Sequence, residues 1–383
     1  MRLEPVVGDD PRAVLRAVRA ALHGAGPALG VGAAENLPAE VPAGTAAVVT
    51  TSGSTGVPKS VVLSRDALTA SALATADRIG DGAWLLALPA TYVAGLQVLV
   101  RSVIADREPA ILSGSFTPQA FTATAAMMVS ATGERRVPTY TSLVPAQLTR
   151  LLDAADRDAS VGAALRSFER VLIGGQALAP AVRERAEAAG VRITRTYGST
   201  ETSGGCVYDG VPLRGTRLAV EEGEVWVSGP SLADGYLDDV ERTDAVFVHD
   251  TDGVRWYRTG DTGSIDDGVL RIHGRIDNVI VSGGLNVSLD RVERLVRTVP
   301  GFAEAVVVGV PDERWGEASV IVVAHRDADG AHLDDARAAV AQSIGPHARP
   351  ARLVLVDDLP TLASGKPDRA ALRRLAHLPP TGH

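Results

Sequence analysis

The sequence predicts an α/β fold: a large N-terminal α/β sandwich that carries a small β-unit, followed by an α+β C-terminal domain. Strand-like and helix-like segments alternate as far as about residue 200, which is typical of a largely parallel sheet covered by helices. From about residue 212, short strands are separated by Gly and Asp, which indicates antiparallel pairing. After Gly274, strands and helices mix again over about 100 residues, the size of a separate domain.

Hydrophobic periodicity places the elements of the N-terminal part in order. Residues 11–23 have apolar side chains at helical spacing and predict a surface helix, whereas the Gly/Pro/Ala-rich stretch 24–44 predicts a loop. The following elements are predicted as strand 45–51, helix 64–78, strand 84–88, strand 137–141, helix 145–155, strand 171–173, helix 180–189 and strand 191–197.

The β-unit and the C-terminal domain are predicted from shorter apolar runs. The β-unit is expected to contain strands at 218–220, 224–228, 254–258 and 269–273. The C-terminal domain is expected to contain helices at 289–299 and 333–344 and strands at 303–310, 318–324 and 352–356.

Composition excludes several classes of function. The 383 residues include 45% hydrophobic and 22% charged residues, as in soluble globular proteins. A net charge of −8 gives no general reason to bind nucleic acid or an anionic membrane, and no apolar run reaches the ~20 residues of a membrane span. The acidic N-terminus does not resemble a secretory signal, and the single cysteine, Cys206, excludes an internal disulfide or a thiolate metal cluster. A cytoplasmic protein is expected.

Two of the 38 Lys and Arg residues are lysines, Lys59 and Lys366. Arginine can replace lysine on most solvated surfaces, but not where a compact and flexible point charge with three donors is needed. The two lysines are therefore candidates for chemistry. The alternative is that they occupy their positions by accident.

Lys59 ends a loop rich in glycine and hydroxyl residues. Glycines let backbone N–H groups approach an anion closely, hydroxyls add donors and Lys59 adds a cation, so the loop suits a di- or triphosphate. It lacks the G-x-x-x-x-G-K-[ST] pattern of P-loop NTPases. A Gly/Ser hairpin without a ligand is the alternative. The predicted phosphate-binding residues are Thr51, Ser52, Gly53, Ser54, Thr55, Gly56 and Lys59.

Five further motifs follow this loop along the chain. They are Y-G-S-T-E at 197–201, G-P with G-Y at 229–236, Y-R-T-G-D at 257–261, G-R-I-D-N with G-G at 274–284, and S-G-K-P-D-R at 364–369. In this order, the six motifs resemble those of the adenylate-forming superfamily, which contains acyl-CoA synthetases, adenylation domains and luciferases. The resemblance covers about residues 45–370, most of the chain.

The resemblance implies a reaction in two halves. A carboxylate attacks the α-phosphate of ATP to give an acyl-adenylate and pyrophosphate, and the thiol of CoA then displaces AMP. Lys366 would bridge the carboxylate and the α-phosphate, and Thr200 would donate to the α-phosphate. Glu201 would bind Mg²⁺, a hard ion that prefers oxygen ligands. Without the resemblance, Glu201 could be a solvated acid and Lys366 a lysine in a flexible turn.

The resemblance also implies an adenosine site. Tyr197 would stack on the adenine ring. Asp261 accepts hydrogen bonds only when ionised, which fits the ribose hydroxyls, although such an Asp could also simply cap a turn. The residues implied are Gly174, Gly175, Gln176, Tyr197, Gly198, Asp261 and Arg275.

The family rotates its C-terminal domain between the two half-reactions. Rotation about Asp277 would take Lys366 away and bring Gly283 and Gly284 to the site, where two glycines leave room for the pantetheine arm of CoA. The implied division is an N-terminal domain at 1–274, a hinge at 275–277 and a mobile C-terminal domain at 278–383.

Stretches at 88–101, 141–148 and 200–213 resemble the o-succinylbenzoate–CoA ligases of menaquinone biosynthesis. That substrate is a keto diacid, and Arg101 is the candidate partner of its second carboxylate. The chain departs from the family at Tyr92, where His is usual, so another aryl or acyl acid stays open. The predicted acyl-substrate residues are Tyr92, Arg101, Ser142, Ser199, Gly204 and Gly205.

Two other functions are alternatives. A free-standing amino-acid adenylation enzyme would carry an acid near the gate segment to hold the substrate ammonium, and residues 88–101 contain none. A non-catalytic nucleotide-sensing scaffold would have no chemical need for Lys366. The expected partners are a small-molecule carboxylic acid, ATP with Mg²⁺, and CoA, without nucleic acid or a membrane span. A homodimer is left open.

Overall fold

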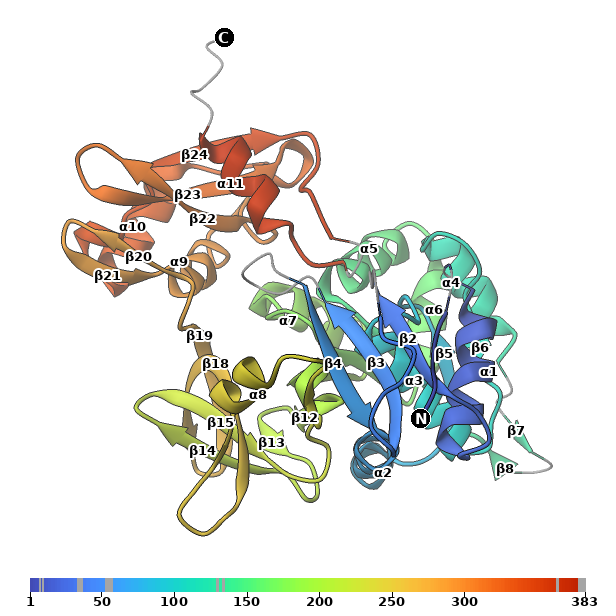
Figure 1. The fold of residues 1–383 in the computed structure, drawn as a ribbon. Coiled ribbons are helices and arrows are strands. Elements are labelled where there is room, and N and C mark those ends of the chain that lie inside the picture. The colour runs from blue at the N-terminus through green and yellow to red at the C-terminus, as the bar shows by residue number, and fades with distance from the viewer. Residues whose placement is uncertain are drawn as a thin grey trace.

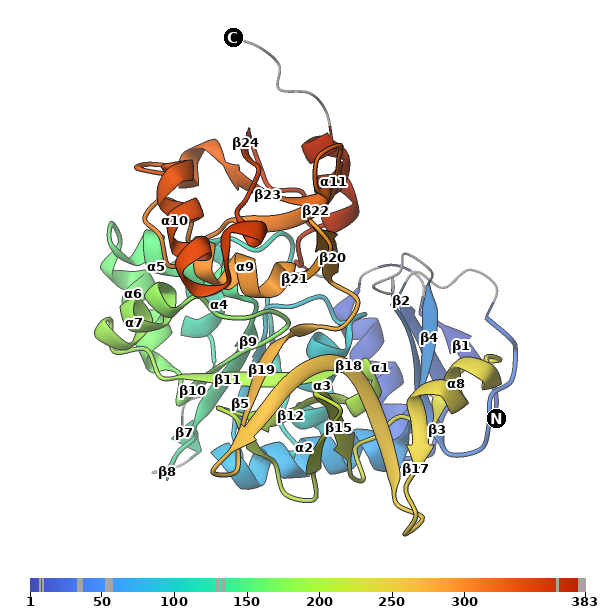
Figure 2. The same ribbon diagram turned by 90° about the vertical axis from the view of Figure 1, so that its left-hand side faces the viewer.

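The computed structural model describes residues 1–377 apart from 7, 9, 33–36, 52–57, 129–130, 133–134 and 363–364. A large N-terminal part lies below a smaller C-terminal body, which the chain reaches through β19 (Val269–Arg275) (Figures 1 and 2). Among the described residues, no cluster of buried apolar side chains combines residues before 275 with residues after 277. The mixed α/β architecture predicted from the sequence is confirmed.

The first sheet of the N-terminal part has five strands in the order β1-β2-β3-β4-β16. The first three strands are parallel, and β4 and β16 extend the sheet in antiparallel pairing. The strands are β1 (Leu3–Pro5), β2 (Ala28–Gly32), β3 (Thr45–Thr51), β4 (Lys59–Ser64) and β16 (Gly235–Tyr236).

The second sheet has seven strands in the order β13-β12-β11-β10-β9-β5-β6. The strands from β6 to β11 are parallel, and β12 and β13 are antiparallel additions. They are β5 (Ala83–Leu86), β6 (Ala110–Ile111), β9 (Thr139–Leu143), β10 (Arg170–Ile173), β11 (Ile193–Ser199), β12 (Gly204–Tyr208) and β13 (Val211–Pro212); a separate ribbon joins β7 (Ala131–Thr132) and β8 (Arg135–Arg136).

Helices fill the space between the two sheets and cover the outer face of the second. Trp84 and Leu85, adjacent in β5, belong to different apolar clusters because successive strand residues face opposite sides. The inner layer is α1 (Pro11–Leu22), α2 (Arg65–Ile79) and α3 (Val93–Ile104), and the outer layer is α4 (Pro118–Ala126), α5 (Pro145–Ala155), α6 (Ala159–Ser167) and α7 (Pro180–Ala188). No helix in the described part of the chain is long and apolar enough to cross a membrane.

The β-unit and the C-terminal body complete the fold. The antiparallel β-unit contains β14 (Arg217–Glu221), β15 (Glu224–Ser228), β17 (Phe247–His249), β18 (Arg255–Asp266) and β19, with α8 (Val240–Val246) beside it. The C-terminal body contains β20 (Val279–Ser282), β21 (Leu285–Ser288), α9 (Leu289–Val296), β22 (Val306–Asp312), β23 (Gly316–Ala324), α10 (Leu333–Ser343), β24 (Arg352–Val356) and α11 (Arg369–His377). Two 3₁₀ turns, η2 (His325–Asp327) and η3 (Pro346–Ala348), lie within it.

The prediction of a loop over 24–44 was wrong, because β2 lies inside this stretch. Its glycines reflect crowding and do not mark a loop. A Cβ on Gly30 would lie 2.5 Å from Leu37 Cδ1, and a Cβ on Gly32 would lie 2.3 Å from the Thr50 carbonyl oxygen. The strand therefore needs glycine at position 32, where a backbone oxygen approaches, whereas the flexible Leu37 side chain next to Gly30 could turn aside.

Candidate active site

Glu201 is the most enclosed charged group of the site. It lies in the 3₁₀ turn η1 (Thr200–Thr202), directly after β11, and its backbone carbonyl accepts a hydrogen bond from Ala233 N at 2.8 Å. The residue is 2% exposed. Lys59, at the start of β4, forms an ion pair with Glu201 Oε1, and the Tyr236 hydroxyl donates to the same oxygen at 2.8 Å. Segments that are far apart in the sequence thus meet at one carboxylate.

The charge of Glu201 depends on these partners. Burial by itself would raise the pKa of Glu201, but the Lys59 ammonium and the hydrogen bonds from Lys59 and Tyr236 hold that pKa below its usual value. An ionised carboxylate is an oxygen ligand of the kind that Mg²⁺ prefers. In the described ranges no group of three His, Cys, Asp or Glu side chains could hold a metal ion, so Mg²⁺ here would also need nucleotide and water oxygens.

Asp261 is the second acidic residue of the site, in addition to Glu201. In the β18–β19 hairpin it is paired with Arg275, whose Nη1 donates to Asp261 Oδ1 at 3.2 Å. Tyr197, on β11, donates its hydroxyl to Asp261 Oδ2 at 2.6 Å. Burial raises the pKa of Asp261, and the hydrogen bonds from Tyr197 and Arg275 oppose that rise. Two oriented carboxylate oxygens beside an aromatic ring can bind a diol next to a flat base.

Lys366 reaches this site from the C-terminal body. Its Cε would lie 3.7 Å from a Cβ placed on Gly175, and Gln176 Nε2 donates to the Gly365 carbonyl at 3.3 Å. The side chain keeps contact with solvent, yet surrounding protein atoms desolvate its ammonium and lower its pKa, against the attraction of Glu201 and Asp261. The residues that the structure brings together are Lys59, Gly174, Gly175, Gln176, Tyr197, Thr200, Glu201, Asp261, Arg275 and Lys366.

The β11–β12 hairpin forms a tightly packed wall next to η1. Ser199 pairs with Gly204, and Gly198 pairs with Gly205. A Cβ on Gly198 would lie 2.1 Å from the Gly204 carbonyl oxygen, so no side chain fits there. Of the other predicted acyl-substrate residues, Ser142 is buried in β9 and Tyr92 is half-buried at the N-terminus of α3.

The direct substrate contact predicted for Arg101 is not what the structure favours. Arg101 is 7% exposed on α3, with its guanidinium carbon 4.9 Å from the centroid of the Trp84 ring and Nη2 3.3 Å from the Tyr208 hydroxyl. Trp84 and Tyr208 belong to the apolar cluster between the two sheets. The helical turn directs Arg101 into this core, where its Nε is buried without a hydrogen-bond partner among the described residues, and the predicted substrate contact stays a prediction.

The predicted hinge residue Asp277 and the predicted CoA-channel glycines make different contacts. Asp277 accepts hydrogen bonds from Arg275 at 3.1 and 3.3 Å. Gly283 and Gly284 form the exposed turn between β20 and β21, where a Cβ on Gly283 would lie 2.8 Å from Trp315 Cε3 in the same body. In this arrangement the lysine is at the site and the glycine turn packs within the C-terminal body.

Most of the predicted phosphate loop, Ser52, Gly53, Ser54, Thr55 and Gly56, lies outside the described residues. Thr51, at the end of β3, is described. Its hydroxyl is buried and has no hydrogen-bond partner among the described residues, so it is an unsatisfied oxygen that a ligand could use.

Sequence reasoning missed two contacts. No role was predicted for Tyr236, although its place in a G-Y motif was a usable signal. The second is a contact between the two bodies, in which the Thr149 hydroxyl on α5 donates to Glu304 Oε1 at 3.1 Å. No sequence pattern indicated that pair.

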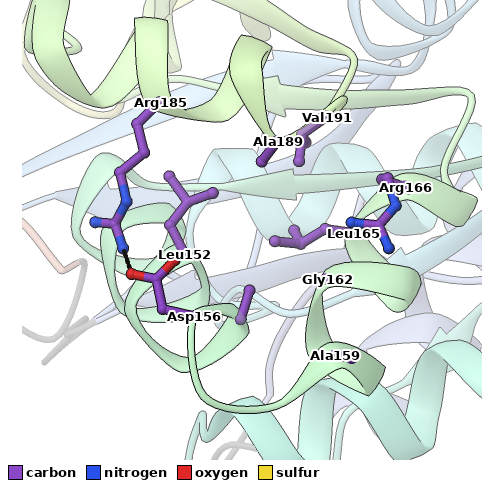
Figure 3. Close-up of a pocket in the computed structure, with 10 residues that line it drawn as sticks. Leu152, Asp156, Ala159, Gly162, Leu165, Arg166, Arg185, Ala189 and Val191 are labelled. Carbon is purple, nitrogen blue, oxygen red and sulfur yellow. Dashed lines mark hydrogen bonds and ion pairs between the residues drawn. The ribbon is translucent and has the colours of Figure 1, made fainter.

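Two hollows open on the described surface. The larger, about 1090 Å³, runs between the N-terminal part and the C-terminal body, and its lining includes Gln176, Gly365, Thr149 and Glu304. The smaller, about 240 Å³, lies between α5, α6 and α7, with the Arg185–Asp156 ion pair at one side (Figure 3). None of the predicted site residues lines the smaller hollow, whereas Gln176 lines the larger one.

The chain is similar to known proteins along most of its length. The AMP-binding enzyme family matches residues 8–237, and the C-terminal domain family of AMP-binding enzymes matches residues 291–366. A probable 2-succinylbenzoate–CoA ligase of Mycobacterium tuberculosis is 42% identical over 86% of this chain and 84% of the relative. A 2-succinylbenzoate–CoA ligase of Listeria monocytogenes is 31% identical over 86% and 69%. The structure of o-succinylbenzoate CoA synthetase from Bacillus subtilis in complex with its acyl-adenylate intermediate aligns with a TM-score of 0.71 at 27% identity, covering 89% of this chain and 72% of that one.

Proposed function

The chain belongs to the AMP-binding enzyme family, and on that premise we propose that it is an ATP-dependent carboxylate–CoA ligase acting on o-succinylbenzoate. The products are o-succinylbenzoyl-CoA, AMP and pyrophosphate. The observation that carries the proposal is Lys366 inserted from the C-terminal body beside Glu201 and Asp261. A lysine placed in this way has a role in forming an adenylate and none in simply storing a nucleotide.

In the first half-reaction, a carboxylate oxygen of the acid attacks the α-phosphorus and the bond to pyrophosphate breaks. Both reactants are anionic, so positioned cations lower the barrier. Lys366 is assigned to the α-phosphate and the incoming carboxylate, Thr200 to the α-phosphate, and Lys59 to the departing phosphates. Asp261 and Tyr197 would hold the ribose and adenine. Mg²⁺, held through Glu201, would neutralise phosphate charge.

In the second half-reaction, the thiolate sulfur of CoA attacks the acyl carbon and the bond to AMP breaks. Lys366 is not needed for this step. We assign residues 1–274 to the N-terminal domain, 275–277 to a hinge containing Asp277, and 278–383 to a mobile C-terminal domain. Rotation would then bring Gly283 and Gly284 to the site for the pantetheine arm. The exposure of that glycine turn supports this assignment.

The choice of o-succinylbenzoate rests on the names of the relatives. Tyr92 stands where the family usually has His. This substitution would change the acyl pocket, so another aryl or acyl acid could bind there. We assign Tyr92, Ser142, Ser199, Gly204 and Gly205 to this pocket. The same proposal includes a cytoplasmic location, with a homodimer as one assembly state to be measured.

CoA-dependent release of AMP tests the proposal. With ATP, Mg²⁺ and CoA, o-succinylbenzoate is expected to support turnover at a kcat/KM at least about tenfold above that of benzoate, salicylate or medium-chain acids. If the enzyme prefers one of those acids, the proposed substrate is wrong but the proposed type of reaction stands. ATP–pyrophosphate exchange only with amino acids would indicate an adenylation enzyme, and no exchange with any acid would contradict the proposal altogether.

A further inference from the structure

Tyr236 is fixed in place beside the buried carboxylate. Its backbone N donates to the Thr243 hydroxyl oxygen at 2.9 Å, and its ring packs against Phe247 with centroids 6.1 Å apart. The preceding residue must be glycine, because a Cβ on Gly235 would lie 2.6 Å from Thr243 Cγ2. The G-Y pair thus lets α8 close onto the edge strand β16 and hold the phenol ring in one orientation.

Lys59 and Tyr236 share one oxygen of Glu201 but differ in freedom. Both meet Oε1, so Oε2 receives neither of these two contacts. The Lys59 side chain is 25% exposed, and its ammonium also lies 5.3 Å from the centre of the Tyr236 ring. A flexible lysine can turn toward the phosphates of a bound nucleotide. Tyr236, packed between Phe247 and Thr243, stays where it is.

We infer that Tyr236 is a positioning residue for the metal site: its hydroxyl holds Glu201 Oε1 when Lys59 turns to the phosphates and leaves Oε2 for Mg²⁺. The inference rests on the proposed function, since it takes Glu201 as the metal ligand. If Tyr236 were absent, Glu201 Oε1 would lose both of these donors when Lys59 turned away. Glu201 is 2% exposed, so its carboxylate would then be buried without them. An ionised carboxylate oxygen can only accept, so the Tyr236 hydroxyl is the donor in this hydrogen bond.

The variant Y236F tests this role, because it removes the hydroxyl and keeps the ring. Affinity for Mn²⁺, a spectroscopic substitute for Mg²⁺, is measured by electron paramagnetic resonance on the enzyme–ATP complex without any carboxylic acid. Loss of a hydrogen bond to a charged group is expected to weaken Mn²⁺ binding about tenfold. The affinity for ATP without a divalent ion is expected to change less than about twofold, since only the metal ligand loses its support.

The variant Y208F is the matched control. Its hydroxyl is also buried and hydrogen-bonded, to Thr75 at 2.9 Å and Arg101 at 3.3 Å, but it does not contact Glu201. Y208F is expected to lower the melting temperature and to leave Mn²⁺ affinity unchanged. An equal loss of Mn²⁺ affinity in Y208F would show that the effect is general loosening, and would overturn the inference.

A double-mutant cycle supplies the second measurement. E201D shortens the carboxylate and withdraws it from Tyr236, so adding Y236F to E201D is expected to cost less than about twofold in Mn²⁺ affinity. A full tenfold loss in that background, or a Y236F affinity within twofold of the wild type, rejects the positioning role. Wild-type ATP–pyrophosphate exchange is recorded in parallel, and its absence would contradict the proposed function independently of the metal result.

Discussion

Lys366 has an ammonium group that is partly desolvated and faces two carboxylates across the boundary between the two bodies. Desolvation lowers the pKa of Lys366, and the attraction of Glu201 and Asp261 opposes that fall. Lys366 is an exposed residue, so solvent screens part of its attraction to an anion that enters the site. The role of Lys366 therefore depends on the groups around it and on the position of its loop. That loop is held by the hydrogen bond from Gln176 Nε2 to the Gly365 carbonyl at 3.3 Å.

K366A is expected to separate the two half-reactions. Adenylate formation should fall at least about a hundredfold, because one positioned cation is lost from a reaction between two anions. Thioester formation from pre-made acyl-adenylate should change less than about threefold. Rapid-quench assays of each half-reaction measure both rates. Equal losses in the two halves would show that Lys366 maintains the fold of the site and does not act in the first step alone.

R101M tests the reassignment of Arg101 to the core. Because its guanidinium lies over Trp84 and against Tyr208, the variant is expected to alter the melting temperature by a few degrees, about 1–2 kcal/mol of cation–π energy. KM for o-succinylbenzoate should change less than about twofold. A large rise in that KM, with unchanged KM for ATP, would instead restore the substrate role that the sequence suggested.

At the scale of elements, α5 links the N-terminal part to the C-terminal body. Gln147 near its start donates to the Ala87 carbonyl at 2.9 Å and accepts from Val144 N at 3.1 Å, which ties the helix to the end of β5. Thr149, less than one turn later, contacts Glu304 in the C-terminal body. The helix therefore carries a contact that exists only while the two bodies lie in this orientation.

The orientation is expected to depend on pH through Glu304. Burial raises the pKa of Glu304, with Asp327 and Asp153 adding to the rise and Thr149 and Arg297 opposing it. Once the bodies separate, the pKa returns toward its ordinary value of 4.5. Glu304 therefore binds its proton more tightly when the two bodies are in contact than when they are apart. Low pH favours the contact, and this contribution is lost as the pH rises from 4.5 through the raised pKa of Glu304.

The ratio of the rate of adenylate formation to the rate of thioester formation should therefore fall as the pH rises from 4.5 through the raised pKa of Glu304. Quench assays of each half-reaction measure the two rates. E304Q removes the ionisation and should flatten the ratio. T149V keeps the carboxylate but removes a bond that lowers its pKa, so its decline should shift to higher pH. An E304Q profile identical to that of the wild type would show that this contact does not control docking.

At the scale of the whole molecule, Lys366 and the Gly283–Gly284 turn belong to the same C-terminal body but contact different parts of the protein. The loop that carries Lys366 is held by Gln176 of the N-terminal part, while the glycine turn packs on Trp315 of its own body. Separate apolar clusters on either side of residues 275–277 allow the two bodies to move as units.

Cross-linking the bodies in the present orientation should stop the second half-reaction. T149C/E304C joined by a short bis-maleimide is expected to keep adenylate formation within about threefold and to slow CoA transfer at least tenfold, because the domain motion that gates it is blocked. Cys206 is buried and does not compete for the reagent. R326C/D358C, a cross-link within the C-terminal body, is the control and should affect neither half. Full turnover by the cross-linked T149C/E304C enzyme would argue against rotation.

Local patterns in the sequence determined much of this protein. Periodicity identified helices such as 64–78 and 333–344, observed as α2 and α10, and the strands of the β-unit. The six motifs indicated Lys59, Tyr197, Glu201, Asp261, Arg275 and Lys366, which the structure brings together. Such information is local because hydrogen bonding of the backbone and the types of side chain needed for phosphate chemistry are both properties of short segments.

Tertiary structure decided what depends on neighbours distant in sequence. Gly32 lies in a stretch whose composition predicts a loop, but the approach of the Thr50 carbonyl oxygen shows why a strand needs glycine there. The sequence suggested a substrate carboxylate as the partner of Arg101 and did not indicate its contacts with Trp84 and Tyr208. The phenol of Tyr236 acquired its role only where β16 meets η1. Burial, contact and pKa are set by which surfaces pack together, and a single sequence does not state that packing.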